Sequence, residues 1–483
     1  MYETVIGLEI HAQLLTATKM FCGCATTSQA APNSLTCPVC LGLPGALPVL
    51  NARAVELGVT AALALGCRVQ PVSTFARKNY FYPDLPKGYQ ITQFDRPLAL
   101  DGELAWTTGA GTQRVRIVRL HLEEDAGKSV HEGFEDSDQF TYLDFNRSGV
   151  PLAEIVTAPD MRSAGEAADF FRRLRAVLVA AGVSDGNMEQ GSLRCDANVS
   201  VRQVGDPSLG VKTEVKNLNS FRFLQRALDF EVDRQVTALA RGEALEPGTR
   251  LWDERSGRTV QMRSKEEAHD YRYFPEPDLP LLRVEAAQVE RLRGALPELP
   301  EARCLRIAER YGLDRDAATF LAQSDSLTAF FERTVAASVD PLAVLHWIRG
   351  ELTRRLAETS IGLEQAAITP DSLSALIVLV AQGRLSATAA KQVFAQLFAS
   401  GGSPERIART AGLLQESDLD TLRGLVERTL AQLPDQVAQF RSGRRSVAGF
   451  LVGQVIKASQ GRANPQVVDR LVRELLDRSG HAT

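Results

Sequence analysis

The sequence has few cysteines and no long apolar run. Seven cysteines in 483 residues, an odd number, argue against a disulfide framework. No apolar segment approaches the length needed to span a bilayer. Met1 leads directly into a strand-like segment, so we expect no signal or transit peptide. These absences predict a cytoplasmic protein that does not contact membranes.

Several catalytic motifs are also missing. There is no G-x-x-x-x-G-K-[ST] loop and no G-x-G-x-x-G after a strand, which excludes a P-loop and a Rossmann nucleotide site. No Gly/Ser-rich stretch offers a serine nucleophile beside a Lys or His base. The net charge of −4 gives no global attraction to nucleic acid, so any such contact requires a local basic patch.

The first 290 residues alternate strand-like runs with Gly and Pro, and they contain two clear helices. The first helix opens at Ser163, with Glu166 completing a capping box, and ends at Gly182. The second runs from Phe221 to about Arg241. This pattern predicts an α+β fold in which helices cover a mainly antiparallel sheet.

The remainder of the chain is predicted to be all-α. Pro297 and Pro300 indicate a linker, and Gly401–Pro404 marks a second break. We therefore predict a catalytic domain over residues 1–292, a helical domain over 293–402 and a small helical tail domain over 403–483.

Polar side chains occupy alternate positions of three apolar strands. Glu9, His11 and Gln13 share one face of the first strand. Arg194, Asp196 and Asn198 share a face of the second strand, and the third carries Lys212, Glu214 and Lys216. Ordinary solvated faces would explain any one strand, but mixed carboxylate, imidazole and basic groups on three strands favour a site for a metal ion and phosphates.

Three consecutive acids follow His121, namely Glu123, Glu124 and Asp125. Such a run is electrostatically costly unless a cation or water reaches it. A Mg²⁺ ion held by Glu9, His11 and one of these acids, bridging nucleotide phosphates, would account for it. Strict alternation puts Glu123 on the His121 face, but a strand that ends there could turn either glutamate inward.

Two close cysteine pairs, Cys22/Cys24 and Cys37/Cys40, could offer four thiolates to one structural zinc ion. A set of free thiols in a loop is the simpler alternative. The other three cysteines stand in apolar surroundings and are expected in the core: Cys67, Cys195 and Cys304.

A basic window near the C-terminus has no acidic residue. It runs from Arg441 to Arg462 and also contains Arg444, Arg445 and Lys457. Basic charge beside a helix suits a phosphate backbone, although a solvated basic face is an equal alternative.

Seven stretches together resemble the GatB family, the B subunits of bacterial aspartyl/glutamyl-tRNA amidotransferases. They include VIGLEIHAQ (5–13), RKNYFYPDLPKGYQ (77–90), HLEEDAGK (121–128) and GSLRCDANVSV (191–201), and the resemblance extends to GFLVGQVIKASQGRANP (449–465).

The resemblance implies an ATP- and Mg²⁺-dependent ligase. Members of the family phosphorylate the side-chain carboxylate of Glu or Asp misacylated on tRNA(Gln) or tRNA(Asn), and ammonia then replaces the phosphate. The ammonia comes from glutamine, which a separate amidase (the A subunit) hydrolyses, in a heterotrimer that also contains a small C subunit. The resemblance also admits the aminoacyl-tRNA synthetase as a further partner.

The resemblance also assigns residues. It implies Glu9, His11 and Glu124 as Mg²⁺ ligands, with Lys78 a channel or substrate contact. Around the phosphorylation site it places the following residues: Arg194, Asp196, Lys212, Glu214, Lys216 and Asn217. The four clustered cysteines match a zinc-binding version of the family, and Arg441, Arg444, Arg445 and Lys457 are candidate tRNA contacts. The alternatives are a stand-alone metal-dependent phosphoesterase and a non-catalytic zinc-containing tRNA-binding subunit.

Overall fold

The computed structural model describes residues 1–27, 30–109, 111–131, 133–262, 271–337, 339–415, 418–459 and 463–478. The chain forms two compact units, Met1–Arg303 and Cys304–Thr483. The division falls within helix α5 (Pro300–Tyr311), later in the chain than the boundary predicted at residues 292/293. Pro300 begins this helix instead of a linker, because proline is tolerated in the first helical turn.

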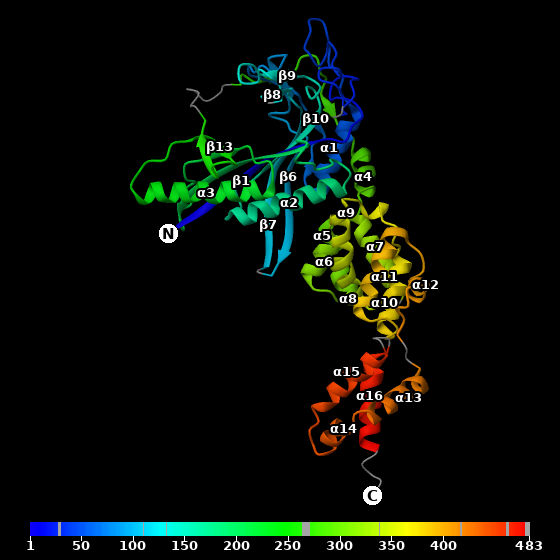
Figure 1. Ribbon diagram of the computed structural model, residues 1–483. Helices are drawn as coiled ribbons and strands as arrows, with labels where there is room; N and C mark the ends of the chain where they lie inside the picture. The colour runs from blue at the N-terminus through cyan, green and yellow to red at the C-terminus, as the bar shows by residue number, and fades with distance from the viewer. Residues whose placement is uncertain are drawn as a thin grey trace. The chain divides into compact units, whose positions relative to one another are not determined.

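A sheet of twelve strands forms the first unit (Figure 1). Its main path runs through β14 (Arg258–Gln261), β13 (Gly248–Asp253), β12 (Thr213–Lys216), β11 (Leu193–Gln203), β1 (Tyr2–Gln13), β10 (Pro151–Thr157), β7 (Gly111–Glu124), β5 (Tyr89–Thr92), β4 (Ala76–Asn79) and β15 (Phe274–Pro275). β6 (Ala99–Thr108) pairs with β7 and with β2 (Arg68–Val69). Among the named strands only β12 and β13 pair in parallel, so the prediction of a mainly antiparallel sheet is confirmed.

Two short ribbons accompany the large sheet. One pairs β3 (Val72–Ser73) with β16 (Leu282–Arg283), and the other pairs β8 (Lys128–Val130) with β9 (Tyr142–Asp144). The other helices of the first unit are α1 (Ala52–Ala64), α2 (Ala164–Ala180), α3 (Phe221–Ala240) and α4 (Ala286–Gly294).

The apolar face of the sheet is covered by helices, of which α2 and α3 lie side by side (Figure 1). Leu8, Ile10 and Ala12 of β1 are fully buried in a core that includes Phe170 of α2 and Leu224 of α3. Because side chains alternate along a strand, the polar residues of β1 are left on the opposite face. That face is where a site can form.

The predicted helix ends are confirmed with one difference. The Ser163 hydroxyl accepts from the Glu166 N–H, and Gly182 takes the left-handed conformation after α2, with φ of +65°. The Glu166 carboxylate, however, accepts from the Arg162 N–H at 2.7 Å, one residue before the expected partner Ser163. The cap is therefore anchored on both residues that precede the helix.

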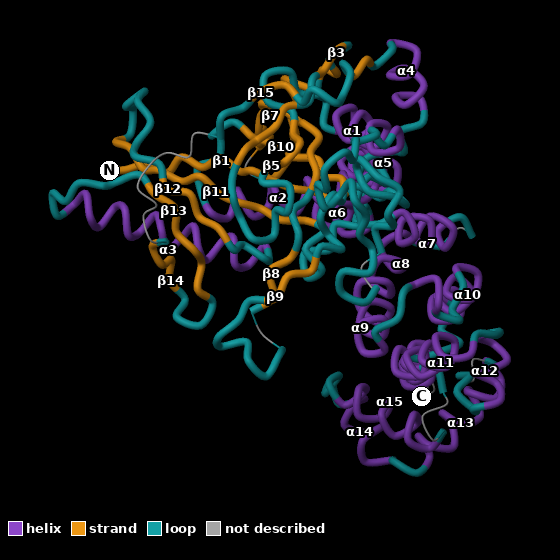
Figure 2. Tube along the Cα trace, turned by 90° about the horizontal axis from the view of Figure 1, so that it is seen from above, coloured by secondary structure: helices purple, strands orange, loops and turns teal. Residues whose placement is uncertain are grey.

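The second unit is helical (Figure 2), with no strand among its described residues. Its helices are α6 (Arg315–Leu321), α7 (Asp325–Val335), α8 (Pro341–Trp347), a π-helical turn at Ile348–Leu352, α9 (Thr353–Thr359), a 3₁₀ turn at Leu363–Gln365, α10 (Pro370–Ala381), α11 (Ala387–Ser400), α12 (Pro404–Thr410), α13 (Leu419–Ala431), α14 (Pro434–Arg441), α15 (Val447–Ala458) and α16 (Pro465–Arg478). No described helix combines the length and apolar character required to cross a bilayer.

Two hydrophobic clusters divide these helices. One gathers buried residues from Cys304 to Ala408, and the other from Leu422 to Leu476. Helix α12 packs on α10 and α11 through Ile407 and Ala408, so it belongs to the first cluster although it follows the predicted break at residues 402/403.

Candidate functional site

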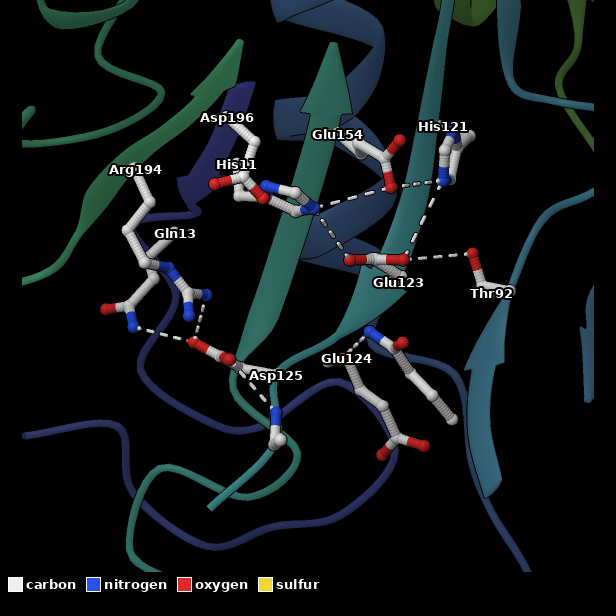
Figure 3. Close-up of polar contacts among 12 residues, drawn as sticks. His11, Gln13, Thr92, His121, Glu123, Glu124, Asp125, Glu154, Arg194 and Asp196 are labelled. Atoms are coloured by element: carbon white, nitrogen blue, oxygen red, sulfur yellow. Dashed lines mark hydrogen bonds and ion pairs between the residues drawn. The ribbon is translucent and has the colours of Figure 1, made fainter. Parts of the chain in front are cut away.

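Three adjacent strands, β1, β10 and β7, bring two imidazoles and two carboxylates together on the polar face of the sheet (Figure 3). The register sets His11 opposite Glu154, and Glu154 opposite His121. Paired residues of an antiparallel ladder point to the same face, so these three side chains form a row. Glu123 joins the row because it lies two residues beyond His121 on the same strand.

The side-chain atoms of this group converge. His11 Nε2 lies 3.4 Å from Glu154 Oε2 and 3.7 Å from Glu123 Oε1. His121 Nε2 lies 3.2 Å from Glu154 Oε2 and 3.7 Å from Glu123 Oε2, and the Thr92 hydroxyl donates to Glu123 at 3.1 Å. Glu123 and His121 are 2% and 4% exposed, so the charges of the group compensate one another instead of being solvated.

The electrostatics of the group follow from this crowding. Burial disfavours the charged form of His121, but the carboxylates of Glu154 and Glu123 outweigh burial and raise the pKa of His121 to about 9. The pKa of His11 is also raised, against burial, by Glu154 and Glu123. Burial likewise opposes ionisation of Glu154, yet the two imidazoles hold its pKa well below the usual value. The two imidazoles therefore favour the ionised form of Glu154.

His11, Glu123 and Glu154, called the metal group below, are suited to a divalent cation. Their ligand atoms all lie within 4.8 Å of one another. Two atoms each about 2.1 Å from one Mg²⁺ ion can be at most about 4.2 Å apart. The two distances from His11 Nε2 to Glu123 and Glu154 fall within that limit. Two carboxylates with one imidazole suit a hard ion such as Mg²⁺ or Mn²⁺.

Glu9 and Glu124 of the predicted Mg²⁺ set do not join this group. The Glu9 carboxylate accepts from Asn198 Nδ2 at 2.9 Å, two positions along β1 from His11. Glu124 accepts from Lys87 Nζ and from the Ile91 N–H. For Glu124 the reason is strand alternation. β7 stays paired with β10 through Glu124, so the Glu124 side chain points away from the face that carries His121 and Glu123.

Sequence reasoning missed Glu154, which contributes a carboxylate to the group. The signal was available, because Glu154 is the one charged residue in the apolar run Val150–Val156. His121 was recognised within its polar cluster but was not given a role. Its position opposite Glu154 depends on the pairing of β7 with β10.

A second network lies beside the group, around Asp125 (Figure 3). Arg194 donates to Asp125 Oδ2 at 2.8 Å and Gln13 donates to the same oxygen at 3.1 Å. Burial alone would raise the pKa of Asp125, but Arg194 and Arg147 outweigh it and hold the pKa below the usual value. Arg194 stands opposite His11 in the register, so it links this network to the metal group.

The remaining predicted site residues lie on β11 and β12 or directly next to β12. Lys216 Nζ donates to Asp196 and lies 2.9 Å from a Glu214 oxygen. Asn217 donates to the Trp252 carbonyl and has a φ of +66°. Lys212 is exposed and lines a cavity of about 190 Å³ together with Glu9 and Asn198. Basic groups therefore gather on the β11–β12 side of the metal group.

Lys78 of β4 lies on the other side. Its ammonium is 4.9 Å from the ring centroid of Tyr271 and 5.9 Å from that of Tyr80. Burial opposes its charge, but Glu123 and the neighbouring tyrosines outweigh burial and the pKa of Lys78 is raised. It remains a cation close to the metal group.

The four cysteines of the predicted zinc site converge, with their sulfur atoms all within 4.8 Å of one another. The pKa of Cys40 is lowered to about 4, chiefly by a hydrogen bond with Cys22, with help from the Cys37 N–H and the Lys19 ammonium. Lys19 is fully buried and donates to the Leu35 carbonyl at 2.7 Å, with Cys40 Sγ at 3.6 Å. Four close thiols, one of them held as a thiolate, are compatible with zinc.

A cavity of about 200 Å³ adjoins this cysteine cluster. Cys22 and Cys40 line it, as do Lys87 and Glu124. Glu124 is therefore separate from the metal group but shares a cavity with two of the cysteines.

The basic residues predicted near the C-terminus are exposed where the structure describes them. Arg441, Arg444 and Lys457 are exposed at or near the ends of α14 and α15. Arg445 Nη1 lies 2.8 Å from Asp477 Oδ1, and the guanidinium carbon of Arg445 lies 4.7 Å from the Phe440 ring centroid. Arg462 lies outside the described residues.

Comparison with known proteins gives consistent matches along the chain. Residues 4–290 match the family model of the GatB/GatE catalytic domain, and residues 329–476 match that of the GatB domain. The chain is 50% identical over 479 residues to the B subunit of the aspartyl/glutamyl-tRNA(Asn/Gln) amidotransferase of Anaeromyxobacter dehalogenans, covering 98% of this chain and 99% of that one. It is 50% identical over 475 residues to the corresponding protein of Moorella thermoacetica, covering 98% and 100% of the two chains. The identity to the corresponding protein of Thermodesulfovibrio yellowstonii is 48% over 475 residues, with 98% and 99% covered.

Proposed function

This chain belongs to the GatB family, and on that premise we propose that it amidates misacylated transfer RNA as one component of a multi-subunit amidotransferase. Its substrates are Glu-tRNA(Gln), Asp-tRNA(Asn) or both. The proposed reaction uses ATP to phosphorylate the misplaced side-chain carboxylate, because a free carboxylate is a poor acyl donor. Ammonia then replaces the phosphate.

The observation that carries the proposal is the convergence of His11, Glu123 and Glu154. Mg²⁺ held there would neutralise charge on the nucleotide phosphates. An oxygen of the substrate carboxylate attacks the γ-phosphorus of ATP, the bond to the β,γ-bridging oxygen breaks, and ADP leaves. The product is an acyl phosphate.

Glu124 and Lys78 are proposed to act on the second step. The nitrogen of ammonia attacks the acyl carbon, the carbon–oxygen bond to phosphate breaks, and one nitrogen proton must be taken up. Glu124 is 2% exposed and lines a cavity, so it is suited to accept that proton. The Lys78 ammonium is suited to contact the negative charge that develops on the substrate.

The β11–β12 side of the site is proposed to hold the nucleotide. Arg194, Lys212, Lys216 and Asn217 supply cationic and amide donors there for phosphate oxygens. Asp196 and Glu214 are proposed to orient Lys216, whose ammonium lies 2.9 Å from each carboxylate.

The cysteine cluster is proposed to hold a structural zinc ion, since no open ligand position is needed for the chemistry above. The family also supports the remaining assignments. An amidase partner, the A subunit, would supply ammonia, a small C subunit would complete a heterotrimer, and the aminoacyl-tRNA synthetase is a further partner. Arg441, Arg444, Arg445 and Lys457 would contact tRNA phosphates. A tRNA-dependent activity would place the protein in the cytoplasm.

The test is ATP cleavage by the chain co-purified with its amidase partner, with and without Glu-tRNA(Gln) and Asp-tRNA(Asn). ATP turnover should require misacylated tRNA and should be lost in Glu123→Gln. Glu103→Gln is the matched control, because Glu103 carries the same charge on β6 of the same sheet but pairs with the exposed Arg114.

The two alternatives give different results in the same experiment. Tight tRNA binding without ATP cleavage would replace the proposal with a non-catalytic tRNA-binding role. Phosphoester hydrolysis without tRNA or partner would indicate the metal-dependent phosphoesterase.

A further inference from the structure

A stacked aromatic pair lies at the β5–β4–β15 side of the sheet. Phe94 follows β5, and Tyr273 precedes β15. Their ring centroids are 4.0 Å apart and their planes differ by 6°. Phe94 is nevertheless 56% exposed, so an aromatic surface remains open to solvent beside its stacked partner. An apolar ring held flat and exposed in this way is a platform for another planar ring.

The pair is connected to the metal group by two routes. The Thr92 hydroxyl donates to Glu123, and Phe94 follows Thr92 by two residues, so their Cα atoms are at most about 7 Å apart. On the other route the rings of Tyr273 and Tyr271 pack edge to face, with their centroids 5.9 Å apart. The Lys78 ammonium lies over the Tyr271 ring.

The electrostatics of Tyr273 agree with this position. Burial raises the pKa of its phenol, Lys78 lowers it, and Glu154 and Glu123 raise it further. The ring therefore lies within electrostatic reach of the metal group.

The strand order determines which ligand suits the pair. The metal group occupies the central strands β1, β10 and β7. Arg194, Lys212 and Lys216 lie on the β11–β12 side, which is the side suited to a triphosphate. The aromatic pair lies beyond the opposite edge of the group, next to β5 and β15. A second substrate that approaches the metal group from this side would meet the two aromatic rings first. It would then reach Lys78 and the metal group, which can bind its carboxylate.

We propose that the Phe94–Tyr273 pair stacks the 3′-terminal adenine of the aminoacyl-tRNA, and that this contact directs the esterified amino acid toward the metal group. The inference rests on the proposed function. In an aminoacyl-tRNA the base and the amino acid are attached to the same ribose, so a base platform must lie close to the reacting carboxylate. The two tRNAs end in the same nucleotide. One aromatic stacking surface can therefore bind the terminal base of either tRNA.

The first experiment compares tRNA that ends in the terminal adenosine with tRNA that lacks this one nucleotide, both deacylated, in binding to the full-length chain. The wild-type chain should bind the complete tRNA on the order of tenfold more tightly. Phe94→Ala should reduce this ratio to about one, whereas Phe94→Trp should retain it because the indole preserves the stacking surface.

The chain offers a matched control. Phe134 is 49% exposed and also stacks on a tyrosine, Tyr142, with centroids 4.0 Å apart. Phe134→Ala removes the same ring from the same kind of pair and should leave the ratio unchanged. A ratio that survives in Phe94→Ala, or that falls equally in Phe134→Ala, would overturn the proposal.

Kinetic measurements on the assembled enzyme distinguish the adenine of tRNA from the adenine of ATP. Phe94→Ala should raise the KM for Glu-tRNA on the order of tenfold and leave the KM for ATP unchanged. A rise in the KM for ATP alone would assign the pair to the nucleotide instead. At saturating tRNA the variant should still cleave ATP, so failure of this inference is distinguishable from failure of the proposed function, in which the wild-type enzyme itself cleaves no ATP.

Discussion

The neighbouring glutamates Glu123 and Glu124 provide the sharpest test of the site. Both are 2% exposed, and they differ by one position on β7. Glu123 faces His11 and His121, whereas Glu124 faces Lys87. We predict that Glu123→Gln loses divalent-cation binding and that Glu124→Gln retains it, although the substitutions are chemically identical.

The expected magnitude follows from the ligand count. Loss of a group that only supports a metal ligand typically reduces metal affinity 10- to 100-fold. Glu123 is one of three converging ligands, so its neutralisation should exceed that range, with a loss of at least about 100-fold, or roughly 2.7 kcal/mol. Glu124 contributes no atom to the group, and its replacement should change the affinity by less than about threefold.

The assay is Mn²⁺ binding by the purified full-length chain, followed by electron paramagnetic resonance, with Mg²⁺ competition. A second readout distinguishes ligand loss from misfolding. Because Glu123 helps to raise the pKa of His121 to about 9, Glu123→Gln should lower that pKa, as measured by NMR titration. Wild-type Mn²⁺ affinity in Glu123→Gln, or equal losses in both variants, would refute the assignment and return the metal to the set Glu9, His11 and Glu124.

Three further predictions concern other parts of the chain. Lys19→Met should reduce zinc affinity about 10- to 100-fold in a chelator competition, because it removes the buried ammonium beside Cys40 Sγ. Lys87→Met is the control and should leave the zinc affinity unchanged. Equal zinc affinities in the two variants would contradict this prediction. Asp125 has a lowered pKa when folded, so the stability it contributes is present above its unfolded value of about 3.9 and is lost as the pH falls through the folded value. Asp125→Asn should therefore lower the unfolding temperature of the first unit at pH 7, at a cost of about 3 kcal/mol, and flatten its decline below about pH 4; an unchanged acid profile would argue against this role. Arg444→Ala should weaken tRNA binding and reduce the slope of log affinity against log salt by about one, and an unchanged slope would remove it from the interface.

The alternation of side chains along β1, β7 and β11 could be predicted from the sequence alone. A period of two separates Leu8 and Ile10 from Glu9 and His11, and this separation holds whatever the neighbouring strands are. The same local rule predicts Glu123 on the face of His121, and in the structure Glu123 contacts His121 whereas Glu124, the last residue of β7, contacts Lys87. The resemblance to a family favoured Glu124, so the local rule and the family assignment disagree here.

The cysteine pairs and the helix ends are local features of the same kind. Cys22 and Cys24 are close in the chain, as are Cys37 and Cys40, so a single loop is enough to bring the pairs together. Ser163 and Gly182 act on the backbone groups next to them. Each of these depends on a few neighbouring residues and on no distant contact.

Only the tertiary structure decided which distant residues meet. Glu154 enters the metal group because β10 pairs both with β1 at the start of the chain and with β7, in a register that sets Glu154 between two histidines. Phe94 and Tyr273 stack across a long stretch of the chain for a similar reason, since β4 pairs with both β5 and β15. Register depends on the packing of the whole apolar face, and a shift of one residue would turn every one of these side chains to the other side. The sequence by itself therefore determined which side chains are presented on a polar face, and the fold determined the partners they meet there.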